Sequence, residues 1–168
     1  MRAPVEPSTF AGFVRLAGVF YRAIDPQYRA FALDGDRKPG RYSNPSRPIL
    51  YLSASPEGAE AAMIAHQSID GPSHELLAFE VHADRIFDLR NHTRCFAAGF
   101  DPADAEEPWD EILAAGGTPP SWGVADQLQR LGANGLIVPS RRVPGRWHLV
   151  LFGLNKIGSP MVTPRLTD

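Results

Sequence analysis

The sequence predicts an α+β fold. Apolar runs at 48–54 and 135–140 are typical of buried strands, whereas 56–69 and 121–135 have the composition of helices. The order is mixed, with strands and a few short helices, which indicates the α+β class. With 168 residues and 43% apolar content, the chain is long enough to form a single domain, residues 1–168, around its own core.

In the N-terminal part, the Pro-rich residues 1–9 are expected to form a flexible tail. The run VFYRAI at 19–24 predicts a short strand. Residues 25–48 are rich in Gly, Pro, Asp and Arg and predict a loop of a length that is often functional. After the buried strand at 48–54, Ser55 is expected to cap the next helix, with Pro56 in its first turn.

The rest of the chain continues the mixed order. The pattern predicts one long strand or a bent pair at 74–89, a short helix at 106–117, a helix at 121–135 and strands at 135–140 and 146–154. Val124, Leu128 and Leu131 recur at helical spacing, so the helix has an apolar face. Gly116 and Gly132 are expected to end the two helices.

Composition and charge exclude several classes of protein. The net charge of −2 gives no sign of a nucleic-acid or anionic-membrane partner. The one cysteine, Cys95, forms no intrachain disulfide and is expected in the core. Because no segment resembles a signal peptide or a membrane helix of about 20 apolar residues, we expect a cytoplasmic protein.

The common catalytic and cofactor motifs do not occur. The five histidines show no His-x-x-x-His spacing, which disfavours a metal site. There is no Gly-x-Gly-x-x-Gly, P-loop or Gly-x-Ser-x-Gly motif, which disfavours Rossmann, P-loop and α/β-hydrolase sites. What remains is a set of arginines and tyrosines on predicted strands and loops.

Each of these residues has a structural and a functional interpretation. Arg22 lies inside a predicted strand, where it either faces solvent at an edge, pairs with a carboxylate such as Glu57, or binds a phosphate through its guanidinium group. Arg41 and Tyr42 end the long loop, as a solvated turn or as part of a site. Tyr51 alternates with Leu50 and Leu52, so it is either a core tyrosine or a ring that stacks on a base.

The motifs FYR, GRYSNP, ILYLSASPEGAEAAMIAH and GLIVPS occur in an order that resembles the RES domain, from about residue 19 to 154. The C-terminal part looks most like the ParT-like subgroup. The resemblance implies an ADP-ribosyltransferase-like core of small packed β-sheets with short flanking helices. It also implies a toxin of a bacterial RES–Xre type toxin–antitoxin system that uses NAD as its substrate.

The resemblance assigns NAD-binding residues to this sequence. The family arginine falls on Arg22, and the loop arginine of its Gly-Gly-Arg-Trp-Asn motif falls on Arg41. Tyr42 replaces the tryptophan, Asn44 follows one residue late, and the strand tyrosine falls on Tyr51. The resemblance implies that the two arginines bind the pyrophosphate and that the two tyrosines stack on nicotinamide.

The family glutamate and serine are displaced. The glutamate position holds Ala62, so Glu57 or Glu60 on the same helix would have to contact the ribose. Either glutamate could instead serve only as a surface or helix-dipole residue. The family serine falls on Ser121 or on Ser140, each of which could also be a capping or turn residue.

The resemblance therefore implies an NAD-dependent ADP-ribosyltransferase that passes ADP-ribose to a target protein. The alternatives are an NAD glycohydrolase or phosphorylase, or a nucleotide-binding module that has lost its glutamate. A cognate antitoxin protein is expected to cover the active site. Neither a nucleic acid nor a membrane is expected as a direct partner.

Overall fold

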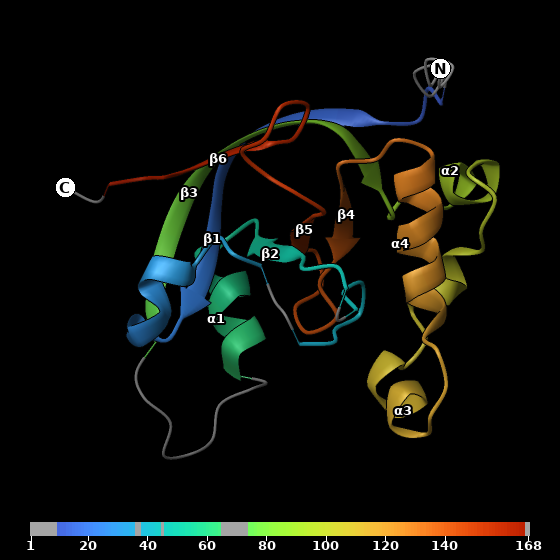
Figure 1. Ribbon diagram of the computed structural model, residues 1–168, viewed down its shortest axis with the longest axis horizontal. Helices are drawn as coiled ribbons and strands as arrows, with labels where there is room; N and C mark the ends of the chain where they lie inside the picture. The colour runs from blue at the N-terminus through green and yellow to red at the C-terminus, as the bar shows by residue number, and fades with distance from the viewer. Residues whose placement is uncertain (1–9, 36–37, 45, 65–73, 167–168) are drawn as a thin grey trace.

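The computed structural model describes residues 10–35, 38–44, 46–64 and 74–166. Its elements, shown in Figure 1, are β1 (Val14–Ile24), η1 (Pro26–Phe31), β2 (Leu50–Ser53), α1 (Pro56–Ile64), β3 (Glu75–Asp88), α2 (His92–Ala97), η2 (Pro102–Ala105), α3 (Trp109–Ala114), α4 (Pro120–Arg130), β4 (Gly135–Pro139), β5 (Trp147–Leu151) and β6 (Met161–Pro164). This mixture confirms the α+β class. In the described part of the chain, no helix is long and apolar enough to cross a membrane.

The strands of the described residues form one sheet in the order β1-β2-β5-β4-β3-β6. β1 also pairs with β3, antiparallel, over most of its length, so the sheet curls back on itself. β1 meets β2 through the pair Tyr21 and Ser53. The result is two packed portions: β1, β3 and β6 on one side, and β2, β5 and β4 on the other (Figure 1).

β3 belongs to both portions because it bends. It pairs with β1 up to Ala83 and again at Ile86, and from Ile86 to Asp88 it runs parallel to β4. Between these stretches Arg85 has a positive φ of 53°, which turns the strand. The sequence left open one long strand or a bent pair, and the structure has one bent strand.

The short central strands are buried on both faces. On β2, Leu50 and Leu52 face a cluster between the two sheet portions, together with Phe20 of β1 and Phe79 of β3. Tyr51 faces the other way, against a second cluster under α4 and α2. This alternation, which the sequence predicted, follows from the two-residue period of a strand. Figure 1 shows α4 beside β4, on the side away from β1 and β3.

Several local predictions are confirmed. Ser55 Oγ accepts from the Gly58 backbone N–H at 3.1 Å, and Pro56 begins α1. Gly116 and Gly132 follow α3 and α4 with positive φ, as helix-ending glycines do. Cys95 is fully buried, and burial raises its pKa to about 11.

Other local predictions need correction. β1 begins at Val14, not at residue 19, and the predicted long loop contains the 3-10 helix η1. Ser121 does not cap α4, because α4 begins one residue earlier, at Pro120. α2, η2 and β6 were not predicted. The expected tail, residues 1–9, and the predicted end of the helix at 65–69 lie outside the described residues.

Candidate functional site

Two connections meet at one end of the central strands. β2 and β5 are antiparallel, so the end of β2 lies beside the start of β5, with Ser53 opposite His148. β4 and β5 are also antiparallel, and Pro139 lies opposite Trp147. The β2–α1 connection and the β4–β5 hairpin therefore share this end, where most of the predicted site residues lie.

Tyr51 holds the loop that precedes β2. Its hydroxyl accepts from the Tyr42 backbone N–H at 3.1 Å and shares a hydrogen bond with Ser43 Oγ at 3.2 Å. Tyr42 is 3% exposed and Ser43 is 0% exposed, so the inner side of the loop is part of the core. Burial raises the pKa of Tyr42 far above its ordinary value, which keeps its hydroxyl protonated.

Helix α4 holds the same loop from the other side. The Ser121 hydroxyl, fully buried, donates to the Arg41 carbonyl, and Trp122 Nε1 donates to the Gly40 carbonyl at 2.8 Å. Arg47 adds a hydrogen bond to the Tyr42 carbonyl at 3.4 Å and an ion pair with Asp126 on α4. The backbone of residues 40–42 is thus fixed by side chains from β2 and α4.

Two guanidinium groups converge next to this loop. Arg41 Nη1 donates to the carbonyls of Ala105 at 2.9 Å and Glu107 at 2.8 Å, and Arg141 Nη2 donates to Ala105 at 3.4 Å. Burial lowers the pKa of Arg41, and the charge of Arg141 lowers it further, while Asp110 acts in the opposite direction. Two like charges held this close favour an anion between them.

Arg141 is a residue that the sequence analysis missed. It follows Ser140 in the hairpin between β4 and β5, and three arginines within 141–146 were its only signal. Ser140 shapes this hairpin, because its backbone N–H donates to the Arg146 carbonyl at 2.8 Å and its hydroxyl accepts from Val143 N–H at 3.2 Å.

The carboxylates of α1 lie outside the buried part of the site. The Glu57 side chain is 64% exposed and pairs with Arg146 of the hairpin at 3.2 Å. Glu60 is exposed as well, and Ala62 is half-buried. Under the start of α1, Ser53 Oγ and His148 Nδ1 are hydrogen-bonded at 2.8 Å, and burial lowers the pKa of His148.

Arg22 lies on a different face. Tyr21 shares a face with its partner Ser53, so strand alternation puts Arg22 on the opposite face, with Phe20 and Ile24. Arg22 Nη1 donates to the Ala32 carbonyl, just after η1, at 2.8 Å. The structure thus anchors Arg22 and Arg41 to two different elements, η1 and η2.

Asn44 orders a turn. Its Oδ1 accepts from the Ser46 backbone N–H at 2.9 Å and from the Ser46 hydroxyl at 2.6 Å, and it forms an isolated bridge with Arg47. Of the predicted site residues, Arg41, Tyr42, Tyr51 and Ser121 therefore form one hydrogen-bonded group. Glu57 and Ser140 are linked through Arg146.

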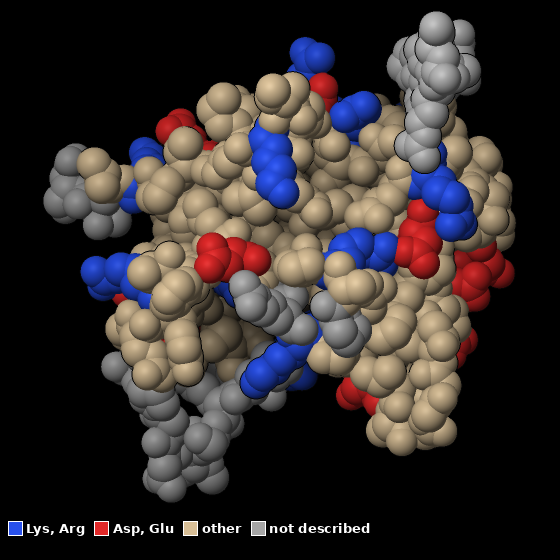
Figure 2. Space-filling view, viewed as in Figure 1, with Lys and Arg blue, Asp and Glu red and all other residues tan. Residues whose placement is uncertain are grey.

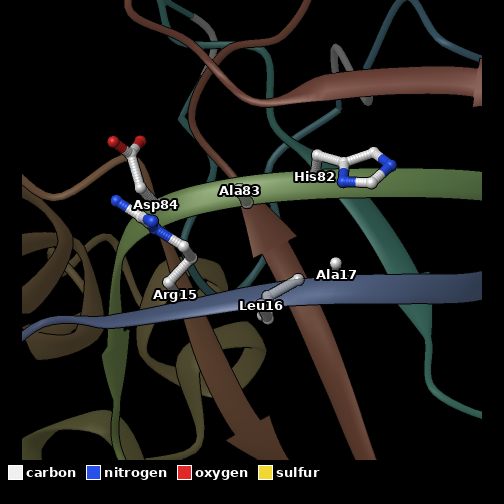
Figure 3. A pocket seen from close by; sticks show the side chains of 6 residues that line it. All are labelled: Arg15, Leu16, Ala17, His82, Ala83 and Asp84. Carbon is white, nitrogen blue, oxygen red and sulfur yellow. The ribbon is translucent and has the colours of Figure 1, made fainter.

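Two surface hollows lie elsewhere on the described surface. A hollow of about 250 Å³ between β1 and β3 has Arg15 and Asp84 at one end and His82 at the other (Figure 3). A larger one of about 470 Å³ lies between η1, β3 and the segment after β6, and Ala32, the partner of Arg22, lines it. On the face shown in Figure 2, basic and acidic side chains are interspersed among the described residues.

Comparisons with known proteins agree with the fold. A family model described as the RES domain matches residues 19–163. A solved structure of the M. tuberculosis MbcT–MbcA toxin–antitoxin complex contains a similar chain, with a TM-score of 0.62 and 18% identity. The match covers 90% of this chain and 84% of that one. No curated protein matches the sequence.

Proposed function

The chain belongs to the RES domain family, and we propose that it is the toxin of a toxin–antitoxin pair that cleaves the nicotinamide–ribose bond of NAD. The family match over 19–163 and a fold shared with a chain of a toxin–antitoxin complex support the proposal. In the cell, toxin and NAD would meet in the cytoplasm. A cognate antitoxin protein would cover the site until the toxin is released.

The observation that carries this proposal is the convergence of Arg41 and Arg141 on the Ala105 carbonyl. Guanidinium groups bind phosphate oxygens through parallel, charge-assisted hydrogen bonds, and a pyrophosphate would relieve the repulsion between the two cations. Because Tyr51, Ser121 and Trp122 fix the loop, Arg41 is held in place before the ligand arrives. The arginine pair would therefore hold the pyrophosphate of NAD.

The buried residues have a supporting role in this proposal. Tyr42 and Ser121 are too enclosed to touch a ligand, so they would act by holding the loop. Tyr51 would act in the same way through its hydroxyl. Arg22, anchored on Ala32, would contact NAD from the other sheet portion.

Transfer of ADP-ribose to a target protein is the reaction that the ParT-like resemblance favours, and hydrolysis or phosphorolysis are the alternatives. The bond breaks through an oxocarbenium-like state, which negative charge near the ribose stabilises. Of the two glutamates of α1, Glu57 is the one that forms an ion pair with the hairpin, at Arg146. Ala62, at the family glutamate position, favours a second candidate function, a nucleotide-binding module with weak catalysis.

The test is NAD turnover by the purified chain, freed of any partner, with nicotinamide release and label transfer to proteins of a cell extract followed together. Arg141→Ala removes an exposed cation with one long hydrogen bond, so we expect it to fold. It should raise the KM for NAD about tenfold or more, the value of a lost charged hydrogen bond. The matched control is Arg130→Ala, an exposed arginine on α4 that should leave KM unchanged.

The outcomes separate the candidates. Rapid release without extract indicates a glycohydrolase or a phosphorylase, and dependence on phosphate distinguishes these two. Release that requires extract and labels a protein indicates ADP-ribosyl transfer. Absence of both from the wild-type chain, with NAD still bound, would establish the binding module instead.

A further inference from the structure

Ser53 and His148 form a pair that no predicted role uses. Their atoms Oγ and Nδ1 are 2.8 Å apart, and the two residues stand directly opposite each other on β2 and β5. Ser53 is 5% exposed and His148 is half-buried. Because both side chains leave paired strands, the imidazole ring has a defined orientation.

The pair lies in the candidate site. Ser53 and Tyr51 are two residues apart on the same face of β2, which separates them by about 7 Å along the strand. Tyr51 holds the loop of Arg41, and the hairpin that carries Ser140 and Arg141 leads into the strand of His148. The imidazole therefore lies at the end of the sheet where the hairpin and the start of α1 meet.

The start of α1 lies against this ring. A Cβ on Gly58 would lie 3.9 Å from Cε1 of His148, which is an ordinary packing distance, and 3.0 Å from Ser55 Oγ. The charged groups on the surrounding elements are Glu57 and Glu60 of α1 and the hairpin arginines Arg141, Arg142 and Arg146, and the titratable Tyr21 of β1 lies opposite Ser53. Glu57 and Arg146 neutralise each other in an ion pair at 3.2 Å.

The displaced glutamate leaves the site without a buried carboxylate at the family position. Glu57 is mostly exposed and paired, Glu60 is exposed, and position 62 is alanine. His148 is the titratable group that β2, β5 and α1 enclose at this end of the described sheet. A neutral imidazole is also the commonest general base in enzymes.

We propose that His148 accepts the proton of the nucleophile that attacks the ribose of NAD, with Ser53 as the positioning residue that orients its ring. The inference rests on the NAD cleavage proposed above. Nδ1–H donates to Ser53 Oγ, and Nε2 carries the lone pair. Burial lowers the pKa of His148 below its ordinary value of 6.5, so the ring is neutral at neutral pH.

The step balances without a further reactant. A hydroxyl of water or of a target side chain attacks C1′ of the ribose, and its proton passes to Nε2 of His148. The bond between C1′ and the nicotinamide nitrogen breaks, and its electron pair makes nicotinamide a neutral leaving group. The proton on His148 is then released to solvent, which restores the neutral ring.

The experiment is the pH dependence of kcat and KM for nicotinamide release by the full chain. His148→Asn is the main variant, because its amide replaces Nδ1 toward Ser53 but has no group at the place of Nε2. We expect kcat to fall about 100-fold or more, the usual value of a general base, with the KM for NAD nearly unchanged. His82→Asn, an exposed histidine on β3, is the matched control and should behave as wild type.

The pH profile decides between a base and a structural pair. A general base must be deprotonated, so wild-type kcat should fall as the pH is lowered, along an acid limb whose midpoint lies below pH 6.5. The variant His148→Asn should lose that limb. If His148→Asn keeps the acid limb of the kcat profile, the inference about His148 is overturned, however far kcat falls. The proposed NAD cleavage is not affected by that outcome. Absence of NAD turnover by wild type at every pH overturns the proposed function and this inference with it.

A second variant covers a failure of His148→Asn to fold. Ser53→Ala keeps the imidazole but removes the acceptor that favours its protonated form. Its acid limb should therefore move to lower pH, with a reduced kcat. If the acid limb of Ser53→Ala has the same midpoint pH as that of wild type, the inference is overturned. Circular dichroism at each pH separates these effects from unfolding.

Discussion

At the scale of single residues, the hydroxyl of Ser121 shows how burial changes the meaning of a motif. The resemblance offered Ser121 as a candidate for the family serine. In the structure this side chain is 0% exposed and donates to the Arg41 carbonyl. Its effect on a ligand would pass through the loop that it holds.

Ser121→Ala is therefore expected to lower the free energy of unfolding by about 1–3 kcal/mol, because it leaves the Arg41 carbonyl without its donor. The KM for NAD should rise, since Arg41 loses its support, while kcat stays near wild type. Denaturant unfolding and steady-state kinetics measure the two effects. The control is Thr118→Ala at an exposed position. A large fall in kcat with unchanged stability would return Ser121 to a direct catalytic role.

The contrast between Arg41 and Arg141 shows what a sequence can say about individual residues. Arg41 stands in a motif with a fixed place before a strand, so the resemblance could select it. Arg141 is one of three arginines in a short hairpin, and only the fold brings it to the Ala105 carbonyl. The partners of Tyr51 were equally hidden, because a hydroxyl inside a core pattern does not reveal what it binds.

At the scale of elements, the loop around Gly40 is the part on which the proposed site depends. A Cβ on Gly40 would lie 2.7 Å from Ser43 Oγ and 3.2 Å from the Tyr51 hydroxyl. A side chain at residue 40 would therefore have to displace Ser43 for the loop to keep its packing against β2. Glycine is needed at position 40 because the loop and β2 approach each other closely there.

Gly40→Ala is expected to push Ser43 away from Tyr51, lower the free energy of unfolding by about 1–3 kcal/mol, and raise the KM for NAD. The matched control is Gly123→Ala in α4, where no heavy atom lies within 4 Å of the added Cβ. That change should stabilise the helix by about 0.5–1 kcal/mol. Thermal unfolding measures the stability of both variants. An equal change of stability in Gly40→Ala and Gly123→Ala would contradict the packing argument.

The elements that the sequence predicted are those whose local pattern decides their structure. β2 and β4 are apolar runs buried on both faces, and α4 combines helical spacing with a glycine end. α2 has only six residues, too few for a periodic pattern. β6 has a single buried side chain, Val162, and forms because β3 offers it an edge.

At the scale of the whole molecule, the two apolar clusters share the strands between them. β2, β5 and β4 send alternate side chains to each cluster, with Leu149 and Leu151 on one side and Val150 on the other. The strands cannot leave one cluster without opening the other. The loop that carries Arg41 is tied to the second cluster through Tyr42.

This sharing predicts that damage to either cluster destabilises the whole chain. Leu52→Ala in the cluster between the sheet portions and Leu128→Ala in the cluster under α4 replace side chains that are 1% and 0% exposed. Each should lower the free energy of unfolding by about 2–5 kcal/mol, the usual cost of such a cavity. Leu166→Ala, at a 90% exposed position, should change it by less than about 0.5 kcal/mol.

The cooperativity itself is the sharper test. If the strands couple the two clusters, unfolding of Leu52→Ala and of Leu128→Ala followed by far-ultraviolet circular dichroism and by tryptophan fluorescence should give one coincident transition in each variant. Trp147 packs against the first cluster and Trp122 binds the loop next to the second, so fluorescence reports on both. Separate transitions in Leu128→Ala would mean that α4 and the arginine loop can open while the sheet stays folded. Coincident transitions would mean that the arginine loop unfolds together with the rest of the chain.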